Sequence, residues 1–169
     1  KAGEGKSTLA SQILISAREQ GYKCFAYSGE LPNTIFKSWM NFQGAGRKHI
    51  FEYQDNPYGD IGDNISQTNK ALISDWYRHY VYIYDNSVID GVETSSLLKI
   101  TEKVIQQYGV RVILMDNLMT AMTLDNSRGS DQYEHQTEFV NQLRSLAVKY
   151  NVMIILVAHK RKNGYGGNE

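Results

Sequence analysis

The chain has 169 residues, enough for one domain with a substantial core. Its 18 basic and 18 acidic side chains balance, which excludes nucleic-acid binding through a high overall positive charge, so that any such site must be a local patch. The single cysteine, Cys24, excludes an internal disulfide and fits a reducing compartment. No apolar run approaches the ~20 residues of a membrane span and no signal peptide is evident, so we expect a soluble intracellular protein without a membrane partner.

The first eight residues match a phosphate-binding loop of the pattern G-x-x-x-x-G-K-[ST], without its leading glycine. In such a loop backbone N–H groups cradle the phosphates, Lys6 reaches the β- and γ-phosphates, and the Ser7 hydroxyl binds Mg²⁺. Residues 9–17 are good helix formers, and the positive end of that helix would face the phosphates. This helix favours the loop over the alternative, a flexible terminus that matches by chance. The residues predicted to bind ATP are Gly3, Glu4, Gly5, Lys6, Ser7 and Thr8.

Strands and helices are predicted to alternate along the rest of the chain. The predicted strands are residues 23–28, 80–84, 112–115 and 152–157. Most of these strands are continuous apolar runs, as in a parallel sheet that is covered on both faces. The predicted helices are residues 31–43, about 64–78, 97–108 and 139–150. The order predicts a doubly wound α/β fold with a mainly parallel sheet flanked by helices.

One stretch is predicted to be a loop-rich excursion and a second one a loop. Residues 44–63 contain Pro57 and four glycines. Residues 119–129 are polar and unusually long for a connection in an α/β fold, and long loops in compact domains are often functional. Because Thr123, Asp125, Asn126 and Ser127 offer little to bury, we expect residues 119–131 to be mobile when no DNA is bound.

A second element of the nucleotide site follows the third predicted strand. The apolar run 112–115 leads directly into Asp116. The carboxyl ends of parallel strands form the edge at which α/β folds bind ligands. Asp116 is therefore predicted to hold Mg²⁺, directly or through water, together with Ser7.

Four motifs occur in the order and spacing of a RecA-like motor domain. They are Gly5-Lys6-Ser7-Thr8, Tyr27-Ser28-Gly29-Glu30-Leu31, Leu114-Met115-Asp116-Asn117-Leu118 and Leu156-Val157-Ala158-His159-Lys160-Arg161-Lys162. Over nearly its whole length the chain resembles the DnaB-type hexameric replicative helicases, within them the branch of phage primase-helicases and the mitochondrial Twinkle helicase. The phosphate loop is specific only to the superfamily, whereas 28–30 and 158–162 favour the helicase branch. The resemblance implies that residues 1–169 form a single RecA-like helicase ATPase domain with a P-loop NTPase fold.

The resemblance also implies roles for residues after two of the strands. Glu30 takes the position of the acid that polarises the attacking water, so Glu30, Lys6 and His159 are the implied catalytic residues. His159 takes the position of a His or Gln that senses the γ-phosphate. The alternatives are a glutamate in the first turn of the next helix and a strand-end histidine that faces solvent. Lys160, Arg161 and Lys162 are the implied contacts to single-stranded DNA, and the alternative is a solvated basic segment.

The implied function is that of a motor that hydrolyses ATP, with Mg²⁺, to move along single-stranded DNA and unwind duplex. The implied partners are single-stranded DNA and the other subunits of a homo-hexameric ring, with a primase or primase domain as a further candidate. The implied location is the cytoplasm of a bacterium or of a phage-infected host, ahead of the mitochondrial matrix. Two alternatives stay open, a RecA/RadA- or KaiC-like ATPase and a non-hydrolysing, nucleotide-dependent module for helicase loading or scaffolding.

The chain is expected to be a piece of a longer protein, truncated at both ends. The strand that should precede the phosphate-binding loop and the loop's first glycine are not in the sequence. In the resembled family the arginine finger that acts on a neighbouring subunit lies further downstream than residue 169. We therefore expect a polypeptide of only these 169 residues to show negligible ATPase activity and no unwinding.

Overall fold

The computed structural model of the chain describes residues 5–54, 59, 61–85, 96–123 and 132–158. The helices are α1 (Lys6–Glu19), α2 (Asn33–Ala45), α3 (Gln67–Tyr77), α4 (Leu97–Tyr108), α5 (Leu118–Thr123) and α6 (Gln132–Tyr150), with a short 3-10 turn, η1 (Arg47–His49). The strands are β1 (Cys24–Ser28), β2 (Ile50–Gln54), β3 (Ile61–Ile65), β4 (Val81–Ile83), β5 (Val112–Asp116) and β6 (Met153–Val157). None of the described helices combines the length and apolarity that crossing a membrane requires.

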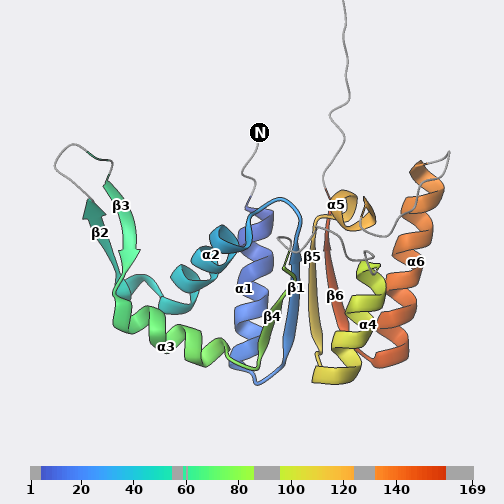
Figure 1. Ribbon diagram of the computed structural model, residues 1–169, viewed down its shortest axis with the longest axis horizontal. Helices are drawn as coiled ribbons and strands as arrows, with labels where there is room; N and C mark the ends of the chain where they lie inside the picture. Colours follow the sequence, from blue (N-terminus) through green and yellow to red (C-terminus); the bar gives the residue numbers. More distant parts are fainter. Residues whose placement is uncertain (1–4, 55–58, 60, 86–95, 124–131, 159–169) are drawn as a thin grey trace, which may run out of the picture.

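Four of the strands form one parallel sheet in the order β4-β1-β5-β6, which confirms the predicted fold class (Figure 1). The two inner strands, β1 and β5, are buried at every residue, as their continuous apolar runs predicted. Their register sets Ser28 opposite Asp116, and β5 pairs with β6 so that Asp116 lies opposite Val157. The ends of three strands therefore meet at one edge of the sheet.

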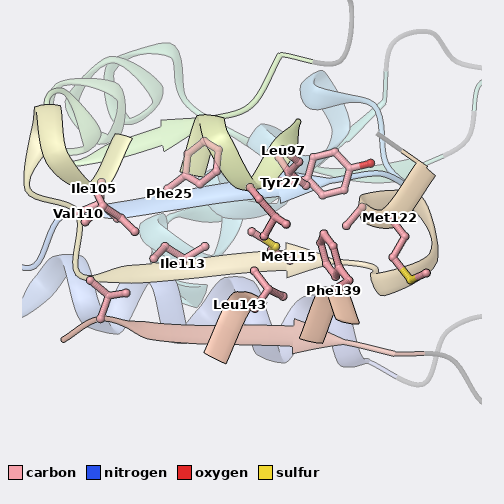
Figure 2. Close-up of a cluster of buried hydrophobic side chains, with 13 residues drawn as sticks. Phe25, Tyr27, Leu97, Ile105, Val110, Ile113, Met115, Met122, Phe139 and Leu143 are labelled. Atoms are coloured by element: carbon pink, nitrogen blue, oxygen red, sulfur yellow. The ribbon is translucent and has the colours of Figure 1, made fainter. Parts of the chain in front are cut away.

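Side chains of the inner strands alternate between two apolar clusters, one on each face of the sheet. On one face, Phe25 and Ile113 pack with residues of α4 and α6, and Figure 2 shows Phe139 and Leu143 of α6 in this cluster. On the other face, Ala26 and Leu114 pack with residues of α1 and α2. The helices thus cover both faces, and α1 begins at the edge where β1 and β5 end (Figure 1).

The prediction of a loop-rich excursion over residues 44–63 is wrong for most of the residues of this range that the structure describes. α2 continues to Ala45, and after η1 the strands β2 and β3 form an antiparallel hairpin, with Ile50 opposite Ile65 and Gln54 opposite Ile61. This hairpin stands away from the main sheet (Figure 1). Because most of its residues are exposed, it lacks the apolar run that reveals a buried strand.

The boundaries of the helix predicted at about 64–78 also change. Ile65 belongs to β3, and α3 begins after Ser66, whose hydroxyl oxygen accepts a hydrogen bond from the backbone N–H of Asn69 (3.2 Å). Serine is a favoured residue at this capping position because it satisfies an N–H that has no partner in the first turn.

The prediction of a loop from Met119 to Gly129 is wrong in its first part. Residues 118–123 form helix α5, in which Ala121 and Met122 are buried in the cluster shared by β5 and α6. Those two apolar side chains hold the segment in a helix that polar composition alone did not suggest. Residues 124–131, including Asp125, Asn126 and Ser127, lie outside the described residues, so their expected mobility stays a prediction.

Candidate functional site

The start of α1 provides a place for anionic groups. Gly5 adopts a left-handed conformation (φ 71°, ψ 7°) directly before the helix, and α1 begins at Lys6. Glycine takes this conformation without the steric penalty of a side chain, and it leaves no side chain to cap the helix. The first amides of a helix have no carbonyl partner within the helix, and its dipole is positive there. The turn at residues 5–8 therefore offers backbone N–H groups and a positive helix end to an anionic group.

The carboxylate of Asp116 belongs to the same face of the sheet as α1. In β5 the side chains of Val112 and Leu114 pack in the cluster with α1, and Asp116, two residues further, continues that alternation. Asp116 is fully buried, as is Ser28, its partner in β1. The strand thus delivers a buried carboxylate beneath the helix whose first turn carries Ser7.

The oxygen atoms at this edge suit Mg²⁺. Hydroxyl and carboxylate oxygens such as those of Ser7 and Asp116 are the donors that Mg²⁺ prefers, and the ion usually completes its shell with water and nucleotide phosphates. Among the described residues no three His, Cys, Asp or Glu side chains gather as a metal cage. The donor set therefore fits an ion that is shared with a bound nucleotide better than one held by the protein alone.

A hydrogen bond with Asn117 connects the side chain of Glu30 to the end of β5. The side-chain amide of Asn117 donates a short hydrogen bond to a carboxylate oxygen of Glu30, although 87 residues separate the two. Asn117 is buried, whereas Glu30 is exposed to solvent. α2 begins at Asn33, so Glu30 precedes the helix and is not a first-turn residue. The alternative explanation of Glu30 as a glutamate of the first helical turn is therefore wrong.

The turn before Glu30 is packed tightly against α5. The N–H of Gly29 donates to the backbone carbonyl of Asp116 (2.6 Å). A Cβ atom at Gly29 would lie 2.0 Å from the hydroxyl oxygen of Thr120 and 2.6 Å from that of Tyr27, so only glycine fits. Burial raises the pKa of the Tyr27 phenol, more than its hydrogen bond with Thr120 lowers it, which keeps the phenol protonated. We call these two segments, residues 27–30 and 116–120, the β1–β5 junction.

A family model described as an AAA domain matches residues 1–165. The chain belongs to this family of P-loop NTPases. No curated protein sequence gives a significant match to the chain. Membership of the AAA domain family indicates nucleotide binding and nucleoside-triphosphate hydrolysis, typically with Mg²⁺.

All six predicted site residues of this AAA domain that the structure describes lie at the start of α1 or at the ends of β1 and β5. Gly5, Lys6, Ser7 and Thr8 form the start of α1, and Glu30 and Asp116 lie at the end of the neighbouring strands. Gly3, Glu4, His159, Lys160, Arg161 and Lys162 lie outside the described residues. The strand that precedes His159, β6, does neighbour the Asp116 strand, as predicted.

Sequence reasoning missed three residues of the junction. It assigned no role to Gly29, Asn117 or Thr120. The available signal was Asn117, a helix-capping residue type directly after an apolar strand. Its oxygen indeed accepts a hydrogen bond from the N–H of Thr120 (3.1 Å). Its contact with Glu30 needed the register of β1 against β5, which no local pattern contains.

Two pockets of the AAA domain lie away from this edge. One, of about 590 Å³, is lined by residues of α2, α3 and β4 and by the connection between α3 and β4, including Tyr77 and His79. The other, of about 620 Å³, is a shallow hollow on the outer face of α6, around Glu138 and Gln142. Neither is lined by Lys6, Glu30 or Asp116. The phosphate loop and the buried carboxylate of Asp116 instead lie at the edge of the sheet.

Proposed function

We propose that this AAA domain is the motor of an ATP-dependent replicative DNA helicase, which hydrolyses ATP to move along single-stranded DNA and unwind duplex. The observation that carries the hydrolytic part is the contact of Glu30 with Asn117, directly after Asp116. This contact keeps a solvent-accessible carboxylate at the edge of the sheet where β5 ends. The helicase part is supported by the order and spacing of the four motifs that resemble the DnaB-type enzymes.

Each residue of the site has a distinct task in this proposal. Lys6 and the amides at the start of α1 hold the β- and γ-phosphates. Ser7 and Asp116 hold Mg²⁺, which when bound neutralises the charge that develops on the phosphates. Glu30 accepts a hydrogen bond from the attacking water and polarises it toward the γ-phosphate. Its exposure to solvent lets water reach the carboxylate.

The proposal extends to residues beyond the described part of the chain. His159 would sense the γ-phosphate, and Lys160, Arg161 and Lys162 would contact the phosphates of single-stranded DNA. The motor would act as a homo-hexameric ring, with a primase as a candidate partner. It would work in the cytoplasm of a bacterium or of a phage-infected host.

Substitutions at Glu30 and Lys6 test the hydrolytic part in the full-length protein. Glu30→Gln should keep the affinity for MgATP but lower kcat by about 10²–10⁴-fold, because a neutral amide cannot polarise water as a carboxylate does. Lys6→Ala should instead weaken nucleotide binding itself. Glu52→Gln, on the exposed strand β2, makes the same chemical change away from the site and should leave both quantities unchanged. A Glu30→Gln protein that hydrolyses ATP at the wild-type rate would show that the base lies elsewhere.

Two further assays separate the helicase from its alternatives. We expect single-stranded DNA to stimulate hydrolysis and a forked duplex to be unwound in an ATP-dependent reaction. DNA-stimulated hydrolysis without unwinding would favour a RecA/RadA-like ATPase. Nucleotide binding without turnover, with or without DNA, would favour a loading or scaffold module.

A further inference from the structure

Both ends of the Asn117 side chain are engaged. Its oxygen accepts from the backbone N–H of Thr120 (3.1 Å), and its nitrogen donates to the carboxylate of Glu30. The backbone fixes this orientation, because an N–H can only donate and a carboxylate can only accept. A flipped amide would lose both hydrogen bonds. Asn117 is also 4% exposed, so water can hardly replace either partner.

The same residue begins helix α5. Its backbone carbonyl accepts from the N–H of Ala121 (3.0 Å), the first backbone bond of that helix. Its side-chain oxygen caps the helix at Thr120. Asn117 is therefore held through its backbone and through its side-chain oxygen, and its side-chain NH2 group points at Glu30 with little freedom.

We propose that Asn117 is the positioning residue for Glu30, which holds the carboxylate in place for attack and couples its position to α5. This inference rests on the proposed role of Glu30 in hydrolysis. A glutamate side chain has several rotatable bonds, and an exposed one samples many rotamers unless a partner restricts it. The buried amide is such a partner. Errors in placing a reacting group of the order of 1 Å can lower a rate about 10²-fold.

A second contact ties the residue before Glu30 to the start of α5. Gly29 donates to the carbonyl of Asp116 and lies directly against Thr120. Glu30 is thus tied to the start of α5 through the backbone before it and through its own carboxylate. A displacement of α5 changes the position of the carboxylate.

Asn117→Asp distinguishes positioning from simple helix capping. Aspartate has nearly the same shape and caps helices well, so α5 keeps its start. It cannot donate to Glu30 and places a second negative charge beside that residue. In the full-length protein we expect kcat for ATP to fall about 10- to 100-fold. KM for ATP should stay close to that of the wild type, whereas the melting temperature should fall, because the new carboxylate is buried beside Glu30.

Two more variants keep the test decisive. Asn117→Ser retains an oxygen that can cap α5 but is too short to reach Glu30, so it should show the same loss of kcat. In a Glu30→Gln background, Asn117→Asp should cause no further loss, because a positioning residue acts only through its partner. As a control, Asn141→Asp on the exposed face of α6 makes the same chemical change and should leave kcat and KM for ATP unchanged.

The outcomes separate this inference from the proposed function. Wild-type kcat in both Asn117 variants, together with a large loss in Glu30→Gln, would overturn the inference and leave the function intact. The inference would also be overturned if the Asn117 variants lost nucleotide affinity as much as kcat. It would likewise be overturned if Asn117→Asp lowered kcat further in the Glu30→Gln background. A wild-type protein without ATP hydrolysis would overturn both.

Discussion

The β1–β5 junction and the β2–β3 hairpin are both places where strands end in polar segments, but they are packed in different ways. In the junction, Asp116 and Asn117 are buried and Gly29 leaves no room for a single added carbon. In the hairpin, Tyr53 is 47% exposed and Ile61 67% exposed, and Gly62 has open space where a Cβ would lie.

The difference shows that the junction is restricted to one geometry, whereas the hairpin tolerates changes of its side chains. The junction obtains its shape from contacts between segments far apart in the chain, so each atom is constrained by several neighbours. The hairpin obtains its shape from the pairing of its own backbone. Catalytic geometry needs the first kind of construction, because small displacements there change rates. The two regions should therefore respond differently to equivalent substitutions.

Truncation of Leu114 in β5 should give the largest effect on stability. The side chain is fully buried under α1, so Leu114→Ala loses apolar burial and leaves a cavity. We expect the free energy of unfolding in urea to fall by about 2–5 kcal/mol. The matched variant Ile61→Ala in the hairpin should change it by less than about 1 kcal/mol. Equal losses would show that the hairpin is as tightly constrained as the sheet.

Gly29→Ala should have the next largest effect, on both stability and activity. The new methyl group would overlap the side chain of Thr120, which must move together with the start of α5. We expect a loss of about 1–3 kcal/mol in the free energy of unfolding. ATP hydrolysis should also fall, because Glu30 is the next residue. Calorimetry and a steady-state ATPase assay measure the two effects.

Gly62→Ala is the control for this comparison. No atom lies within 4 Å of the position of its Cβ, so the hairpin should accept the substitution without loss. The double variant Gly29→Ala/Thr120→Gly should recover part of the stability by removing the two atoms that clash most. A neutral Gly29→Ala would mean that the junction can relax, which would weaken the case for a fixed Glu30.

The buried strands β1 and β5 were predictable from the sequence, whereas the exposed strands β2 and β3 of the hairpin were not. β1 and β5 are covered on both faces, so their residues are apolar without interruption and stand out in the sequence. β2 and β3 are covered on neither side along most of their length, so aromatic, acidic and polar residues alternate and resemble a loop. Their pairing is a property of the folded backbone that composition does not report.

For the candidate site, sequence predicted the residue types but not the contacts between them. The phosphate loop and the strand ending in Asp116 are local patterns with a direct chemical meaning. The contact of Asn117 with Glu30 instead depends on Ser28 lying opposite Asp116, and on Gly29 fitting against Thr120. Such pairings arise only when the sheet is assembled.

A smaller effect is expected at Arg18, which fastens α1 to the peripheral helix α3. Its Nε–H donates to the carbonyl of Trp76 (2.8 Å), and its guanidinium lies 3.7 Å from the ring centroid of Tyr80. Arg18→Met should lower the free energy of unfolding by about 1–2 kcal/mol, through one lost hydrogen bond and the lost cation–π contacts with Tyr80 and Trp76. Urea unfolding monitored by tryptophan fluorescence measures this loss.

Arg78 is the matched control for Arg18. It forms an exposed ion pair with Asp75 (2.6 Å), in which both side chains are more than half exposed. Pairs of this kind contribute about 0–1 kcal/mol, so Arg78→Met should be close to neutral. If Arg18→Met and Arg78→Met lowered the free energy of unfolding equally, the contacts of Arg18 would contribute no more than an exposed ion pair. Other contacts would then hold α3 against α1.

The smallest effect concerns the pH dependence of stability at Cys24, in the buried sheet. Burial raises the pKa of the Cys24 thiol from 9.0 to about 11, and the charge of Arg18 lowers it only in part. Between these two pH values the unfolded chain has lost the thiol proton and the folded chain has kept it. Stability therefore falls as the pH rises from 9 toward 11, because the folded state binds more protons there.

Cys24→Ala should make this decline shallower, as measured by urea unfolding at several pH values between 8 and 11. A residual decline should persist, because burial also raises the pKa values of Tyr27 and Tyr77.

The hairpin offers the contrast, since a cysteine introduced by Ile61→Cys would stay exposed and should react with a thiol reagent at pH 8 at once. Cys24, fully buried, should react only when the sheet opens. Equal labelling rates at the two positions would mean that the sheet opens as readily as the hairpin, contrary to the packing of β1.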